Sequence, residues 1–190
     1  MGYATITQFK DYLGIKDSGD DALLTRMLLA AQKAVDAFCM RTFEAAADTT
    51  RYFDAIKDVD GPMLIVDKDL AAITTVTNGD GVVVAASSYF TEPVNGTPIY
   101  GLVLKGSSGL SWTYLTDPER AISIAGKWAY SLTAPDDVVQ ATIRLAAHFF
   151  RGKDAQVFDV TATPGLGQMF IPKGFPQDVR LLLGPYKVKL

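Results

Sequence analysis

Few residues of this 190-residue chain have side chains suited to catalysis. His148 is the only histidine, and its predicted helix places it on a polar strip beside Arg144 and Arg151, as expected of a solvated surface. Cys39 is the only cysteine, and it lies at the edge of an apolar helix face, where cysteine usually serves as a small buried hydrophobic residue. Neither has the partners that acid–base catalysis, a nucleophilic thiol or a zinc site requires, so no catalytic residue is predicted.

A group of carboxylates is the second candidate for chemistry, because the segment DVDG looks like part of a calcium-binding loop. An EF-hand loop needs a spaced series of ligands closed by a glutamate between two helices, whereas this segment lies among predicted strands. We therefore interpret the group as solvated loop carboxylates: Asp54, Asp58, Asp60, Asp67 and Asp69. The glycines of PGLGQ also lack the strand-to-helix setting of a phosphate-binding loop. The sequence predicts no metal, no cofactor and no enzymatic activity.

Composition and charge indicate an ordinary globular protein. Hydrophobic residues make up 48% and charged residues 21% of the chain, and the formal charge of −3 gives no sign of tight nucleic-acid binding. A single cysteine excludes an intramolecular disulfide, which suits a cytosolic environment. The sequence has neither a signal-peptide pattern nor an apolar run long enough to cross a bilayer, so we expect no membrane association.

The elements that must position any functional side chain begin with two helices. Thr5 and Gln8 form a capping-box pattern, and Gly14 suits a left-handed end, which predicts a helix over 6–13. A second helix, ALLTRMLLAAQKAVDAFC, follows with Asp20 or Ser18 as its cap. Its helical periodicity gives one wide apolar face, whereas Leu29 and Met40 project from the opposite, polar side.

The middle of the chain, about 49–131, changes to short β-branched and aromatic runs separated by turn signals. This pattern predicts an antiparallel sheet or small barrel, with a tight hairpin turn at Asn78-Gly79. A nearly surrounded apolar helix is then expected from Pro135, a long loop over 152–174, a short helix PQDVRLLL and a basic tail YKVKL. We therefore predict an α+β fold in which 1–48 and 132–190 pack as one helical domain around a β-rich insertion at 49–131.

The two ends of the chain resemble the head-tail connector (adaptor, head-completion) proteins of tailed bacteriophages. The resemblance lies in ITQFKDYLGI, DDALLTRMLLAAQKAVDAFCMRTF, PDDVVQATIRLAAHFFRG and GFPQDVRLLLGPYKV, taken in this order. It implies a virion protein at the head–tail junction, assembled in the host cytoplasm into a ring of typically twelve subunits. Such a ring lies below the portal protein, extends the channel for double-stranded DNA and receives the stopper or tail protein. The family has no catalytic residues, and infectious phages, defective prophages and gene transfer agents all use such proteins.

Two surface patches follow from these patterns as hypotheses. A ring needs two complementary patches on each subunit, and we assign part of one to Leu29, Lys33, Asp36 and Met40. By position, the C-terminal segment 176–186 matches the family's stretch that reaches toward the portal. We therefore assign a contact with the portal or a neighbouring ring to the end of the chain: Leu181, Leu182, Leu183, Tyr186, Lys187 and Lys189.

Two other classes of protein remain as alternatives. One is a β-sandwich module that binds a ligand, perhaps a glycan, and carries helical flanks. The other is a hydrolase that uses carboxylates alone, such as a glycosidase with two acids at a defined separation. Neither alternative explains the helical ends of the chain.

Overall fold

The fold comes from a computed structural model that describes residues 2–155, 160–163, 167–170 and 175–188. The chain divides into two compact units. One, the helical unit, contains residues 1–40 and 135–190; the other, the β unit, contains residues 41–134. The observed class is α+β, with terminal helices that pack together and central antiparallel sheets, so the predicted fold class is confirmed.

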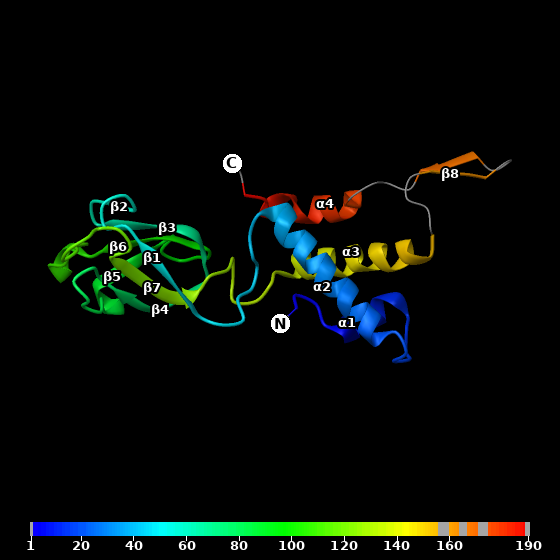
Figure 1. Cartoon of the computed structure of the whole chain (residues 1–190), viewed down its shortest axis with the longest axis horizontal. Helices are drawn as coiled ribbons and strands as arrows, with labels where there is room; N and C mark the ends of the chain where they lie inside the picture. The colour runs from blue at the N-terminus through cyan, green and yellow to red at the C-terminus, as the bar shows by residue number, and fades with distance from the viewer. Residues whose placement is uncertain (1, 156–159, 164–166, 171–174, 189–190) are drawn as a thin grey trace. The chain divides into compact units, whose positions relative to one another are not determined.

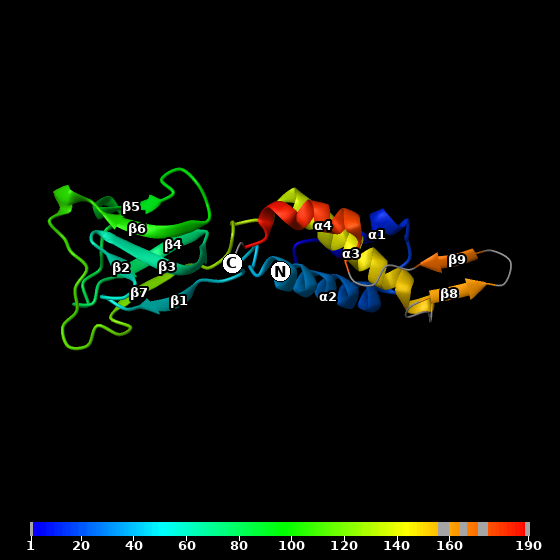
Figure 2. The ribbon, with the colours of Figure 1, turned by 90° about the horizontal axis from the view of Figure 1, so that it is seen from above.

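The helical unit is built around α3 (Asp136–Ala155), which contacts α1 (Ile6–Leu13), α2 (Asp21–Cys39) and α4 (Gln177–Leu183). Figures 1 and 2 show α3 running beside α2 and α4. Side chains are buried on several sides of α3, which confirms that this helix is nearly surrounded. The buried side chains of the four helices include Phe9, Leu24, Leu28, Ala31, Val35, Val138, Ala141, Leu145, Val179 and Leu183.

The ends of the first two helices follow from local chemistry. In α1 the Thr5 side chain accepts a hydrogen bond from the backbone N–H of Gln8, and the Gln8 side chain accepts one from the N–H of Thr5, as the capping box predicts. Gly14 ends α1 with a φ of 73°, which glycine adopts without steric cost. Asp20 precedes α2 but makes no side-chain capping bond, so the predicted cap is present by position only.

The segment after α3 differs from the prediction. We expected one long loop over 152–174, but α3 continues to Ala155, and β8 (Val160–Thr163) pairs antiparallel with β9 (Gly167–Phe170). The loop prediction is therefore wrong. Each strand has only four residues, which is too short a run for an alternating pattern to stand out beside the prolines and glycines of this segment.

The β unit contains two antiparallel sheets that share one core. The first has the strand order β1-β7-β4 and the second β2-β3-β6-β5. Their bounds are β1 (Thr49–Phe53), β2 (Val59–Asp60), β3 (Met63–Leu70), β4 (Ala72–Thr77), β5 (Tyr89–Glu92), β6 (Ile99–Leu104) and β7 (Ile122–Lys127). Every pairing is antiparallel, as predicted, and Figure 2 labels the strands of both sheets.

The core of the β unit draws buried side chains from both sheets, among them Phe53, Leu64, Val76, Leu102 and Ile124. The alternation of β7 is regular, with Ile122 and Ile124 buried and the residues between them half-buried. Both tryptophans of the chain belong to this unit. The indole N–H of Trp112 donates to the Pro62 carbonyl at 2.8 Å, and that of Trp128 donates to the Thr49 carbonyl at 2.9 Å. These bonds satisfy the polar group of each buried indole.

The turn at Asn78-Gly79 is longer than the expected two-residue hairpin. The N–H of Asn78 donates to the Val82 carbonyl, and it is Gly81, not Gly79, that has a positive φ, at 83°. Gly79 is needed for a different reason, because a Cβ there would overlap the carbonyl oxygen of Thr113. The prediction of a turn is confirmed, but the predicted two-residue geometry is wrong. The loop that packs against Gly79 lies far away in the chain, so the local sequence does not reveal it.

Candidate functional site

The first predicted patch lies on the outer side of α2. Leu29 is 51% exposed and Met40 is 41% exposed, although large apolar side chains are usually covered. Lys33 lies between them along the chain and is exposed on the same side of the helix. The structure therefore brings three of the four predicted residues to one surface of α2.

Asp36, the fourth predicted residue, has a different role. Its Oδ1 accepts a hydrogen bond of 2.5 Å from the Tyr3 hydroxyl, and Lys33 lies 3.9 Å from its other oxygen. Burial raises the pKa of the Asp36 carboxyl above its usual value, although the bond from Tyr3 and the charge of Lys33 oppose this shift. Asp36 thus holds the N-terminal segment on α2 within the helical unit.

Sequence reasoning missed the N-terminal segment, whose key residue is Tyr3. Its ring is buried, and its backbone N–H donates to Gln32 Oε1 at 3.2 Å. Two bonds to α2, at Gln32 and Asp36, fix this segment along the flank of the helix. The spacing of four residues between Gln32 and Asp36 was the available signal, because it places both polar side chains on one side of α2.

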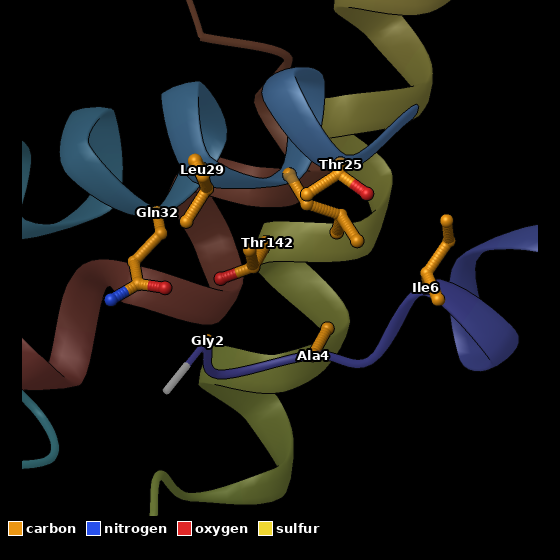
Figure 3. Close-up of a pocket in the computed structure, with 8 residues that line it drawn as sticks. Gly2, Ala4, Ile6, Thr25, Leu29, Gln32 and Thr142 are labelled. Carbon is orange, nitrogen blue, oxygen red and sulfur yellow. The ribbon is translucent and has the colours of Figure 1, made fainter. Parts of the chain in front are cut away.

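A small pocket of about 190 Å³ lies between this segment, α2 and α3. Figure 3 shows Thr25, Leu29 and Gln32 on α2 and Thr142 on α3, with the N-terminal segment that carries Gly2 and Ala4 below α2. The lining consists of Gly2, Ala4, Ile6, Thr25, Leu28, Leu29, Gln32 and Thr142. Leu29 therefore forms one wall of an apolar depression and does not stand alone on the surface.

The residues of the second predicted patch, at the C-terminus, differ in how far they are exposed. Leu181 is 73% exposed, Leu182 is half-buried, and Leu183 is completely buried in the helical unit. A surface contact through Leu183 would require α4 to leave its own core, so Leu183 stabilises the unit itself. Lys189 lies outside the described residues.

The predicted basic tail is held against α2 as far as residue 188. Tyr186 ends a 3₁₀ turn (Gly184–Tyr186) that continues α4, and the Lys187 ammonium lies 5.4 Å from the centre of the Phe38 ring. The N–H of Val188 donates to the Cys39 carbonyl at 3.1 Å. The exposed part of the C-terminal patch is therefore centred on Leu181 and Lys187.

The residues first considered for chemistry have structural surroundings. Cys39 is fully buried, with its thiol 4.0 Å from the Leu183 carbonyl, which confirms the prediction of a small buried hydrophobic residue. His148 is half-buried rather than solvated, and its ring lies 6.4 Å from that of Phe149. The described residues contain no group of three or more His, Cys, Asp or Glu side chains arranged to hold a metal ion.

The carboxylates of the β unit act in turns and ion pairs. Asp54 accepts hydrogen bonds from the N–H groups of Ile56 and Lys57, and these bonds lower the pKa of its carboxyl. Asp67 lies 2.8 Å from Arg51. Burial raises the pKa of Asp69 even though Arg41 lies 3.4 Å away. We interpret each of these acids as a structural group.

The β unit exposes apolar side chains that the sequence analysis did not assign to any surface. Five of them lie on two neighbouring loops, which we call the loop tip: Val82, Val83, Leu110, Tyr114 and Leu115. The loops are joined by a bridge between Gly79 and Tyr114. No helix within the described residues is both long and apolar enough to cross a membrane.

The chain thus combines terminal helices and central antiparallel sheets with exposed apolar side chains, and the carboxylates described above lie in turns and ion pairs. A sequence model of the head completion protein family matches residues 3–188, so the chain belongs to that family. The family is structural and non-enzymatic, which confirms the resemblance seen in the helical ends and overturns the alternative of a carboxylate hydrolase.

Solved structures with the same fold come from gene transfer agents. One chain belongs to the neck of an empty particle computed with C6 symmetry; it is 16% identical, with a TM-score of 0.58. Another belongs to the virion of a native particle and is 19% identical, with a TM-score of 0.56. Each comparison covers 99% of this chain and 91% of the other. No curated protein sequence matches the chain at a significant level.

Proposed function

We propose that this head completion protein forms a ring in the neck of a phage-like particle, below the portal protein. There it extends the DNA channel and joins the head to the stopper or tail. The observation that carries the proposal is the fold likeness over nearly the whole chain to a protein in a neck computed with C6 symmetry. A sixfold axis is compatible with twelve subunits, the number that the family resemblance implies.

The exposed patch on α2 supports the ring. Subunits in a closed ring contact each other through two different surfaces, so each copy must expose two patches. Leu29 and Met40 provide exposed apolar area, and Lys33 provides a charge beside it. We assign one ring surface to these three residues, with Asp36 holding the N-terminal segment behind them.

The charge of the chain supports passage of DNA. The β unit has 11 acidic and 7 basic residues and the helical unit 10 acidic and 11 basic, so their formal charges are −4 and +1. Every phosphate that a protein neutralises adds affinity through counterion release. A channel of low positive charge therefore lets DNA slide without being held.

The C-terminal patch is proposed to contact the portal through Leu181, Leu182, Tyr186 and Lys187, with Lys189 adding charge. Deletion of residues 176–190 is a poor test, because it removes Val179 and Leu183 from the core of the helical unit. The double variant Leu181→Asp with Lys187→Glu changes exposed side chains only. We expect it to lose co-sedimentation with portal particles; undiminished binding would refute the portal contact.

The ring itself is tested by Leu29→Asp with Met40→Asp. Both changes place a charge on an exposed side chain, so the fold should persist while the subunit contact is lost. Native mass spectrometry in the presence of portal particles should show a ring for the wild type and free subunits for the variant. Tyr12→Asp is the matched control, since Tyr12 is also an exposed apolar residue of the helical unit. Rings of unchanged mass for the double variant would refute the assignment of this surface.

A further inference from the structure

We infer that the loop tip of one molecule docks on the helical unit of a neighbouring copy of the same chain, with Leu115 entering the pocket beside Leu29. This inference rests on the proposed ring, because it names one contact between adjacent copies. It is carried by two surfaces that the structure describes separately: a small apolar pocket and a rigid apolar projection.

The pocket fits one aliphatic side chain. Three of its polar side-chain atoms are already bonded within the unit: the Thr25 and Thr142 hydroxyls donate to the carbonyls of Asp21 and Val138, and Gln32 Oε1 accepts the N–H of Tyr3. What remains is the apolar lining around Leu29. At about 190 Å³ the pocket is smaller than the roughly 300–1,000 Å³ of small-molecule sites, so a side chain suits it better than a cofactor.

The loop tip is held rigidly by Asn78, which is only 4% exposed. Its Nδ2 donates to the Ser111 carbonyl at 2.9 Å, and its Oδ1 accepts from the N–H groups of Gly79 and Thr113 at 2.9 and 3.1 Å. One buried side chain thus joins both loops. A surface that is ordered before binding loses less conformational entropy on docking, which favours an apolar contact.

The most exposed apolar residue of the loop tip is Leu115, at 78%. Apolar side chains cluster here on two loops joined at Gly79 and Tyr114, whereas single exposed apolar residues elsewhere need no explanation. A side chain of this size and exposure matches the pocket in shape and chemistry.

Leu115 and Leu181 are both exposed leucines that could enter the pocket, and the charges beside them distinguish the two. The two loops, 78–85 and 105–121, contain three acids, Asp80, Asp117 and Glu119, and two bases, Lys105 and Arg120, so their net charge is −1. Both bases have partners within the β unit: Lys105 Nζ donates to the Ser87 carbonyl, and the Arg120 guanidinium lies 4.9 Å from the centre of the Tyr52 ring. Leu29 is flanked on α2 by Arg26 and Lys33, three residues before and four after it, both exposed. Leu181 is nearly as exposed as Leu115, but Arg180 lies next to it and would meet these cations. Charge complementarity across a contact favours the acidic loops.

The experiment uses the full chain with portal particles and compares Leu115→Asp with the wild type. Burying a leucine side chain contributes about 1.5–3 kcal/mol, so its loss should weaken self-association about 10- to 140-fold. Val94→Asp is the control, because Val94, at 59% exposed, is an exposed apolar residue of the β unit outside the loop tip. Circular dichroism should show the same fold for all three proteins.

A second arm mixes the single variants Leu29→Cys and Leu115→Cys and treats them with a short thiol cross-linker; the buried Cys39 should stay unreactive. A mixed dimer of the two variants, together with weaker assembly of Leu115→Asp, would establish the contact. Wild-type-like assembly of Leu115→Asp would overturn it and leave the ring intact, and cross-linking of Leu29→Cys to Leu181→Cys instead would assign the pocket to α4. If the wild type forms no ring with portal particles, the proposed function is refuted, and the contact between copies is refuted with it.

Discussion

The helical unit and the β unit both bury an apolar core but differ in the side chains that they expose to solvent. Among the described residues, the helical unit has four exposed large apolar side chains, Tyr12, Leu29, Met40 and Leu181. The β unit has twelve, including Leu115 and Val82. Large apolar patches on soluble proteins usually mark contact surfaces. The comparison teaches that the β unit exposes more large apolar side chains than the helical unit and is therefore a second candidate surface for assembly.

The largest expected effect concerns whether the two units unfold separately. Leu145→Ala removes a completely buried side chain from α3, which touches α1, α2 and α4, and should cost about 2–5 kcal/mol. Urea unfolding followed at 222 nm reports mainly the helices, whereas tryptophan fluorescence reports the β unit, which holds both tryptophans. We expect the helical transition to shift and the fluorescence transition to stay. Leu29→Ala is the exposed control, and an equal shift of both transitions would show that the units unfold as one.

A smaller effect is expected in the β unit from Asn78→Ala. The substitution removes three hydrogen bonds of a buried side chain and leaves the Thr113 N–H and the Ser111 carbonyl without these partners, which should cost about 1–3 kcal/mol. Tryptophan fluorescence should now show the shift while the signal at 222 nm changes little. Asn95→Ala, in an exposed loop, is the matched control. Equal stability of the two variants would mean that Asn78 does not hold the loop tip.

The smallest effect concerns Tyr3 and depends on pH. Because burial raises the pKa of folded Asp36, its contribution to stability is complete below about pH 3.8 and declines as the pH rises through the raised value. The Tyr3 hydrogen bond opposes that shift, so Tyr3→Phe should raise the pKa of Asp36 further and cost about 0.5–1.5 kcal/mol near neutral pH.

The measurement for Tyr3 is urea unfolding at 222 nm from about pH 3.5 to about pH 7. The difference between Tyr3→Phe and the wild type should shrink toward the acid end, where Asp36 is protonated in both proteins. Asp36→Asn, which keeps an acceptor for the hydroxyl, is the control and should remove the pH dependence. A difference that stays constant across this range would contradict the role given to Asp36.

How well each feature was predicted depends on how far apart along the chain the residues that determine it lie. The first helix was predicted with its observed bounds, because Thr5, Gln8 and Gly14 lie within the helix or next to it. The antiparallel sheets were predicted as a class from alternation and turn signals, but the division into two sheets depends on pairings such as β1 with β7, about seventy residues apart.

The candidate site shows the same limit. The exposure of Leu29 and Met40 was predicted from helical periodicity alone. The burial of Leu183 was not, because the run of three leucines in α4 gives no sign of which one faces α2 and α3. Tyr3 and the loop tip were also missed, since Tyr3 bonds to Asp36 across 33 residues and Asn78 to Thr113 across 35.

The central claim, a ring in the neck of a particle, is tested most directly by the mass of the wild-type chain in the presence of purified portal particles. Native mass spectrometry and negative-stain electron microscopy would measure the same sample. The account predicts a closed ring on the portal, with six or twelve copies around its axis. A chain that stays monomeric and leaves the portal particles unchanged in mass would contradict it.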